Sequence, residues 1–203
     1  RARARAAQKK QIITVSEITT QEPTRFSGYD EHSVRANVVE VVDLQGKLAV
    51  VLDRSTCYAE MGGQVGDTGE LRAGSALWRI ANTQKAGDVW LHVLEGGDAP
   101  VVGAEIELVV DGARRGAIQR HHTVTHLLHW ALHEVVSREA GQKGSYVGAD
   151  KLTFDFSSAA LTPEQVASVE RLVNEKILEN APVSWNEVNH ADVRGRGDIM
   201  QFF

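Results

Sequence analysis

The sequence of 203 residues contains a single cysteine, Cys57, and no hydrophobic run long enough to span a bilayer. One cysteine excludes an internal disulfide, and this fits a reducing compartment. The start of the chain is basic but lacks the apolar segment of a secretory signal peptide. These absences favour a cytoplasmic globular protein with no membrane partner.

An excess of positive charge is also missing. Lys and Arg number 22 against 27 Asp and Glu, which gives a net charge of −5. This balance argues against a body coated with base for nucleic-acid binding, and no DNA partner is expected, although a local basic patch remains possible. Candidates for that patch, each of which has ordinary surface charge as its alternative interpretation, are Arg114, Arg115, Arg120 and Lys143.

Short β-type runs separated by turns fill residues 25–110 and predict a small barrel or sandwich. A turn is expected at Gln45-Gly46. The expected strands cover residues 34–38, 48–52, 76–82, 89–94 and 105–110.

The second half of the sequence predicts helices and strands in turn. A long helix is expected over about residues 113–139, followed by a strand pair, Tyr146–Gly148 with Leu152–Phe156, that turns at Ala149-Asp150. A second helix begins after Thr162, which forms a capping box with Gln165, and it ends at Asn180 and Pro182. Residues 183–188 are expected to form a strand, and residues 191–200 a turn or short helix.

The predicted fold class is therefore α+β, a small antiparallel β-barrel followed by an α/β layer domain with two main helices on an antiparallel sheet. The expected organisation is a helix end and linker over residues 1–24, a barrel domain over 25–112 and the layer domain over 113–203.

Five of the eight histidines lie between residues 120 and 133. His122, His126, His129 and His133 recur at i, i+4, i+7 and i+11, and so form one stripe along the expected helix, opposite an apolar face. The spacing of His122 and His126 suits chelation of one Zn²⁺, with His129 and His133 as outer groups or substrate contacts. The alternative is a solvated polar face, which a lone pair of histidines would favour.

A glycine-rich segment, Tyr58–Gly69, interrupts the β region. Its glycines permit positive φ and close backbone approach, so it can offer amide groups and the Gln64 side chain to a ligand. Equally consistent is a tight loop between barrel strands, in which Asp67 bonds its own backbone.

Five segments occur together in one order: Phe26–Tyr29, Tyr58–Gly69, His122–His129, Gly144–Ser145 and Phe154–Phe156. In this order they resemble the alanyl-tRNA synthetases, in the part that follows the catalytic and tRNA-recognition domains. The resemblance implies an editing module, in which a barrel precedes a domain that hydrolyses Ser-tRNA(Ala) and Gly-tRNA(Ala). It implies the acceptor end of tRNA(Ala) as partner, with Lys151 as a further candidate contact, and it places ATP and Mg²⁺ only in the family's separate catalytic domain.

The resemblance also implies roles for particular residues. His122 and His126 would be zinc ligands, Gln64 a polar group of the editing pocket, and Thr123 and Thr125 neighbours of that pocket, which would lie between barrel and helix. The zinc would activate water or orient the substrate. For the two threonines, the alternative is a helix-surface position or a bond back to the preceding turn.

The sequence departs from the family pattern in two ways. The family's other zinc ligands form a C-x-x-x-H motif, which is not present up to Phe203, and Cys57 is no substitute. We therefore expect two of four ligands, with zinc absent or weakly bound and little activity in this chain alone. Met61 and Val124 replace residues that are usually smaller, which bears on pocket size.

Three other functions fit parts of the pattern. A free-standing hydrolase acting in trans would not need the basic helix end at the start of the chain. The editing domain of threonyl-tRNA synthetase shares the histidine spacing but lacks the barrel with its glycine-rich segment. A non-catalytic RNA-binding or spacer module fits the incomplete zinc site. The triplet Gly62-Gly63-Gln64 also occurs in peptide release factors, in a different sequence context that indicates coincidence.

Overall fold

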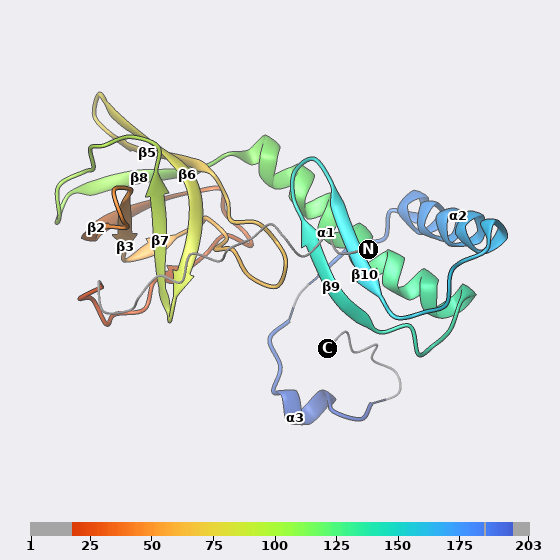
Figure 1. Cartoon of the computed structure of the whole chain (residues 1–203). Helices are drawn as coiled ribbons and strands as arrows, with labels where there is room; N and C mark the ends of the chain where they lie inside the picture. Colours follow the sequence, from red (N-terminus) through yellow and green to blue (C-terminus); the bar gives the residue numbers. More distant parts are fainter. Residues whose placement is uncertain (1–17, 185, 197–203) are drawn as a thin grey trace. The chain divides into compact units, whose positions relative to one another are not determined.

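The computed structural model describes residues 18–184 and 186–196, and the chain divides into two compact units, residues 1–116 and 117–203 (Figure 1). The predicted α+β class is confirmed, because six antiparallel strands close into a barrel in the first unit and two main helices accompany a two-stranded sheet in the second. The division falls inside helix α1 (Gly112–Val135), whose first turn belongs to the barrel unit.

The barrel strands follow the order β2–β3–β7–β6–β5–β8 around the closed sheet. A parallel pair of two-residue strands, β1 (Arg25–Phe26) and β4 (Arg54–Ser55), lies outside it. All five predicted strands are present, and β5 is an additional one. The barrel strands are β2 (Ser33–Asp43), β3 (Leu48–Leu52), β5 (Gly69–Ala73), β6 (Ala76–Ala86), β7 (Val89–Leu94) and β8 (Glu105–Val110).

Apolar side chains on both faces of β3 and β7 explain why these strands read as continuous hydrophobic runs. Val50 belongs to the barrel core, while Val51 and Leu91 belong to a second cluster, and all three are buried. The predicted turn at Gln45-Gly46 is confirmed by positive φ at both residues, 56° and 89°, which suits a two-residue hairpin.

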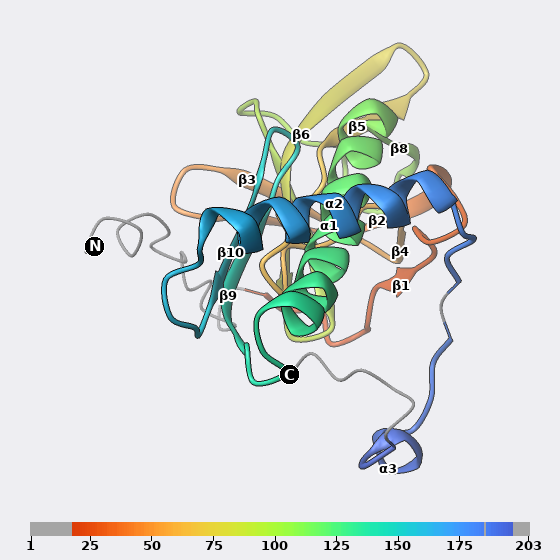
Figure 2. The same ribbon diagram turned by 90° about the vertical axis from the view of Figure 1, so that its right-hand side faces the viewer.

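In the second unit, the predicted strand pair is confirmed as a hairpin of β9 (Gln142–Val147) and β10 (Leu152–Phe156). Its turn is closed by the Gly148 amide, which donates to the Lys151 carbonyl over 3.0 Å. Figures 1 and 2 both show this hairpin alongside α1. Helix α1 ends four residues before the expected limit because the amides of Val136 and Ser137 both donate to the Leu132 carbonyl and turn the chain.

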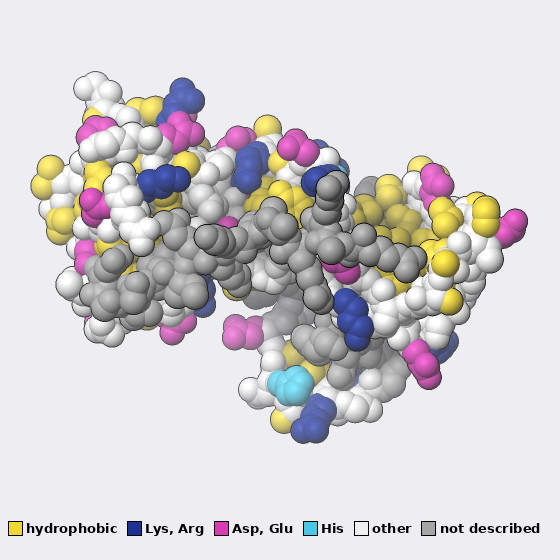
Figure 3. All heavy atoms as spheres, viewed as in Figure 1, with side chains coloured by type: hydrophobic (Ala, Val, Ile, Leu, Met, Phe, Trp, Pro, Cys, Tyr) yellow, Lys and Arg dark blue, Asp and Glu magenta, His cyan; other side chains and the backbone are white. Residues whose placement is uncertain are grey.

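Helix α2 (Pro163–Glu179) begins with the predicted capping box, in which the Thr162 hydroxyl accepts from the Gln165 amide. It ends at Asn180, as predicted, in the left-handed conformation. Val169 and Val173 are buried in one cluster with Ala131 and Leu132 of α1. Other apolar side chains of α2 are exposed, and hydrophobic groups show at the surface over this helix in Figure 3: Val166, Ile177 and Leu178.

The predicted strand over residues 183–188 was wrong. The described residues of this segment form no strand and pair with no other described segment, and Val183 and Val188 are 82% and 60% exposed. Apolar residues alone do not make a strand, since its backbone groups need a ladder partner. A short helix α3 (His190–Val193) falls where a turn or helix was expected. Residues 1–17 and 197–203, with the expected N-terminal helix end, lie outside the described residues.

No helix in the described part of the chain combines the length and hydrophobicity needed to cross a membrane.

Candidate functional site

Helix α1 carries the histidines, and its start is fixed by the barrel unit. The Asp111 carboxylate caps the helix by accepting from the Arg114 amide over 3.0 Å. Beyond the first turn, apolar residues on one side of the helix pack into the core of the second unit, among them Leu127, Leu128 and Leu132. The amphipathic pattern therefore positions the opposite, histidine-bearing side.

His122 and His126 form a stacked pair on this helix. Their ring centroids lie 5.1 Å apart and their planes differ by 18°. His122 is half-buried and His126 lies at the surface. Partial desolvation lowers the pKa of both imidazoles, and the neighbouring His126 lowers the pKa of His122 further. Both rings are therefore biased towards the neutral form, which is the form that binds a metal ion.

The other three histidines of the segment each donate to a backbone carbonyl. His121 Nδ1 donates to Gly148 O over 2.7 Å, and the Nε2 atoms of His129 and His133 donate to Ala140 O over 2.9 and 3.0 Å. Because a carbonyl can only accept, these bonds define which ring nitrogen carries the proton.

The histidine stripe is therefore divided along its length. His129 is 4% exposed and lies against Phe154 of the hairpin, with ring centroids 5.2 Å apart, and it also meets the edge of His133. The hairpin thus packs against the buried His129, whereas His126 lies at the surface and His122 and His133 are half-buried. The roles expected for His129 and His133 as outer groups or substrate contacts stay a prediction.

The two threonines between the paired histidines differ in setting. Thr123 is exposed. Thr125 is buried, and its hydroxyl donates to the His121 carbonyl one turn earlier over 2.8 Å, which is the back-bond considered from the sequence. Their predicted catalytic roles stay a prediction.

Two histidines supply half of a tetrahedral zinc shell. Within residues 18–184 and 186–196, no group of three or more His, Cys, Asp or Glu side chains is arranged to hold a metal ion. The donor set that fits zinc here is the neutral, adjacent imidazoles of His122 and His126.

Gln64 belongs to the barrel unit, in the loop between β4 and β5. Gly62 and Gly63 have φ values of 62° and 87°, and the Gln64 amide closes a tight turn by donating to the Met61 carbonyl over 3.0 Å. Gln64 is 6% exposed. The glycines thus form a tight loop, as one interpretation expected, while the role of Gln64 in a pocket stays a prediction.

A buried ion pair holds this loop in place. The Asp67 carboxylate accepts from the Tyr58 amide over 2.7 Å and from Arg115, whose Nε lies 2.8 Å away. Arg115 also donates to the carbonyls of Gly28 and Thr56, each over 2.8 Å. One guanidinium in the first turn of α1 therefore ties together three segments of the barrel unit; we call this set the Arg115 latch.

The latch corrects the expectation that Arg115 contributes to a basic surface patch. Its side chain is 4% exposed and its charge is neutralised by Asp67, at 1%. Arg114 is half-buried and donates to the Gly66 carbonyl. Of the candidate RNA contacts, the exposed ones are Arg120, Lys143 and Lys151.

A second polar network, which sequence reasoning missed, lies inside the barrel. His92 Nδ1 donates to Val50 O over 2.9 Å, so its Nε2 accepts from the Ser55 hydroxyl over 2.8 Å. The Cys57 amide donates to the same hydroxyl. Serine beside histidine suggests a nucleophile, but both side chains are 0% exposed and burial lowers the pKa of His92 to about 4. This pair is a hydrogen-bonded part of the core.

The sequence profile described as tRNA synthetases class II (A) matches residues 1–114, more than half of the chain. The chain belongs to this family. Its match covers all but the last two residues of the barrel unit and ends in the first turn of α1, at the residue before Arg115.

Similarity to individual members of the family extends over the histidine helix as well. The chain is 42% identical over 205 residues to an alanine–tRNA ligase of Akkermansia muciniphila, covering 100% of this chain and 22% of that protein. It is 43% identical to the alanine–tRNA ligase of Methylacidiphilum infernorum, covering 92% of this chain and 20% of that protein. It is 41% identical to the alanine–tRNA ligase of Opitutus terrae, covering 98% of this chain and 22% of that protein. The chain thus spans about a fifth of the length of these synthetases.

Proposed function

We propose that this chain is the editing region of an alanine–tRNA ligase and that it hydrolyses serine and glycine wrongly esterified to tRNA(Ala). The observation that carries the proposal is the stacked, accessible pair His122 and His126 on a helix that aligns with alanine–tRNA ligases. The contact of a histidine with a possible nucleophile inside the barrel, between Ser55 and His92, is sealed in the core.

The substrate class follows from the limits of binding discrimination. A pocket that accepts alanine has little to grip that glycine lacks, and it rejects one added hydroxyl group poorly, so a second hydrolytic site improves accuracy. In the reaction, water adds to the ester carbonyl, the bond to the ribose oxygen breaks, and the free amino acid and tRNA leave.

His122 and His126 would hold a zinc ion together with ligands from outside the described residues. When bound, zinc supplies Lewis-acid chemistry for water or for the substrate's polar groups. Thr123, which is exposed at the position after His122, would bind a substrate hydroxyl or water. Gln64 is the further polar group that the resemblance assigns to the editing pocket. The acceptor end of tRNA(Ala) binds with help from the exposed cations Arg120, Lys143 and Lys151.

The test is deacylation of Ser-tRNA(Ala) by the full-length ligase that carries this chain. Replacing His122 or His126 by alanine should lower the rate by about 100-fold, the loss expected when a catalytic metal loses a ligand. Aminoacylation with alanine should be unchanged, and the exposed His32→Ala in the barrel unit is the matched control. Equal deacylation by wild type and both variants would refute the proposal.

Zinc content measured by elemental analysis separates two explanations of a loss. Loss of both zinc and deacylation supports the ligand role, whereas loss of deacylation with zinc retained assigns the histidines to the substrate. Deacylation by this 203-residue chain alone should be weak beside that of the full-length ligase, since the described residues bring no third His, Cys, Asp or Glu side chain to His122 and His126. A strongly active chain would contradict the incomplete zinc site, and tRNA binding without hydrolysis by the ligase would favour a non-catalytic RNA-binding module.

A further inference from the structure

His121 precedes the paired histidines and faces a different partner. Its ring is half-buried, and its Nδ1 lies 2.7 Å from the carbonyl oxygen of Gly148, in the turn between β9 and β10. Since the carbonyl can only accept, Nδ1 carries a proton and donates it to this bond. His121 thus ties the turn of the hairpin to the second unit's part of helix α1.

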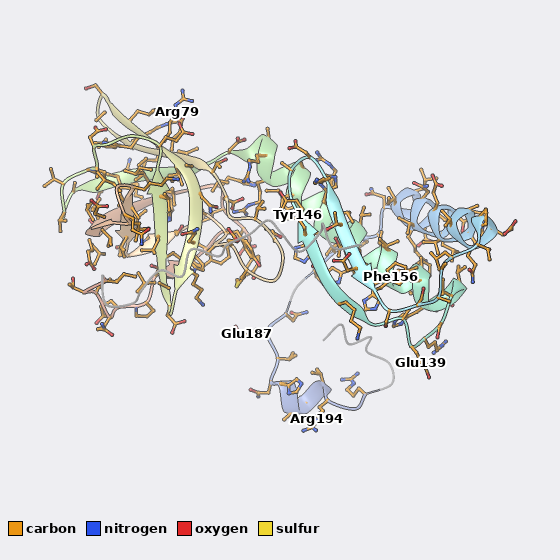
Figure 4. The ribbon with its side chains drawn as sticks, in the orientation of Figure 1. Arg79, Glu139, Tyr146, Phe156, Glu187 and Arg194 are labelled. Atoms are coloured by element: carbon orange, nitrogen blue, oxygen red, sulfur yellow. The ribbon has the colours of Figure 1, made fainter. Side chains whose placement is uncertain are left out.

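The turn is built to lie close to its neighbours. A Cβ atom at Gly148 would stand 2.6 Å from the Tyr146 hydroxyl oxygen and 2.8 Å from its ring, so any side chain there would have to displace the Tyr146 ring. The backbone of Gly148 is fixed further by its amide, which donates to Lys151 O. Figure 4 shows Tyr146 near this end of the hairpin and Phe156 towards the other end. The contact with His121 is therefore made by a backbone with little freedom to move.

The helix side of the contact is held as well. The Thr125 hydroxyl donates to the carbonyl of His121 over 2.8 Å, which links the two residues across one helical turn. His122 and His126 are the next residues after His121 and Thr125, so each member of the stacked pair follows a residue that is bonded in this network. The network of Gly148, His121 and Thr125 thus borders the pair along the helix.

We propose that His121 is a positioning residue of the editing site. Its Nδ1–H fastens the β9–β10 turn to α1 at the residue before His122, and thereby fixes the part of the helix that carries His122 and His126. This inference rests on the proposed editing function and adds a residue that neither binds the metal nor touches the reacting ester. The atom that acts is Nδ1, so substitutions that place an amide group at the position of Nδ1 or of Nε2 test the proposal.

Asparagine and glutamine each mimic one of the two ring nitrogens of histidine. An asparagine side-chain amide falls near the position of Nδ1, and a glutamine amide near that of Nε2. His121→Asn should therefore keep the bond to Gly148, whereas His121→Gln and His121→Ala should lose it. In the full-length ligase, His121→Ala and His121→Gln should lower kcat for Ser-tRNA(Ala) deacylation by about tenfold or more, with KM nearly unchanged, while His121→Asn stays within about threefold of wild type. Gln119→Ala, at an exposed position of the same helix, is the control.

Two measurements on the 203-residue chain are independent of activity and of zinc. Imidazole ¹⁵N shifts should show His121 protonated at Nδ1, and hydrogen exchange of the Gly148 amide should become about tenfold faster in His121→Ala and return towards wild type in His121→Asn. The proposal would be overturned if the Gly148 amide exchanged at an unchanged rate in His121→Ala. It would also be overturned if His121→Asn were as slow in deacylation as His121→Ala, a result that would point to a base at Nε2. If His122→Ala leaves deacylation intact, the editing function itself fails, whatever His121 does.

Discussion

The Arg115 latch offers the sharpest test of how the barrel unit is held together. Arg115→Met keeps most of the volume of the side chain and removes its charge and its donors. The variant leaves the Asp67 carboxylate, 1% exposed, with the Tyr58 amide as its remaining partner among the described residues. It also leaves the carbonyls of Gly28 and Thr56 without this donor.

The expected cost follows from the burial of the pair. Removing one partner of a buried ion pair costs about 3–5 kcal/mol, chiefly because an uncompensated charge stays behind. Since whole domains are stable by roughly 5–15 kcal/mol, Arg115→Met should remove a large fraction of the barrel unit's free energy of unfolding. Arg115→Lys retains the charge but loses the planar fork that reaches three acceptors, so its loss should fall between those of methionine and wild type.

The assay is urea unfolding followed by the fluorescence of Trp78 and Trp90, both in the barrel unit. The matched control is Arg72→Met, which breaks an ion pair with Glu70 in the same unit whose side chains are 47% and 32% exposed. The control should cost less than about 1 kcal/mol. The reasoning is refuted if Arg115→Met costs no more than the control, or if adding Asp67→Asn to Arg115→Met recovers none of the loss.

Three further predictions concern the core and the second unit. Burial lowers the pKa of His92 from 6.5 to about 4, so the unfolded chain binds more protons between these values. The free energy of unfolding should be highest above about pH 6.5 and should fall by about 3 kcal/mol towards pH 4. Urea midpoints should show this fall, and His92→Gln should make it smaller. Burial raises the pKa of Cys57 to about 12, so a thiol reagent at pH 8 should modify it only after unfolding; rapid labelling of the native chain would contradict its burial. Thr162→Ala should destabilise α2 by about 1 kcal/mol, read from amide exchange in that helix, and Thr162→Asp should not.

The fold could be predicted where local chemistry and burial agree. The strands β3 and β7 are apolar in sequence apart from His92, and they are buried except for the half-buried Leu48. The capping box at Thr162 and the turn at Gln45-Gly46 follow from side-chain and backbone rules. Strand β5 was missed because Leu71 is its only buried residue, and its pairing with β6 and β8 is a tertiary effect. The prediction of a strand over residues 183–188 was wrong for the opposite reason, since this segment has apolar residues but no strand partner among the described residues.

The candidate site shows the same limit. The spacing of His122 and His126 places both on one side of a helix, and the structure pairs them. Arg115 could not be distinguished from its neighbours in the sequence, because its burial depends on Asp67, 48 residues earlier in the chain. An acid among the glycines of the Tyr58–Gly69 segment was the available signal, since a buried charge needs a fixed partner.

The division of the histidine stripe is the part of the site that periodicity could not reveal. All four histidines at i, i+4, i+7 and i+11 fall on one side of α1, but helical spacing says nothing about what covers that side. The hairpin after the helix holds that information. A Cβ at Gly148 would displace the Tyr146 ring, so glycine lets the turn lie close to this side chain. Once folded, the hairpin packs Phe154 against His129, which is buried, while His126 stays at the surface and His122 is half-buried. Which imidazoles of a histidine-rich helix are available as ligands thus depends on where the following hairpin lies.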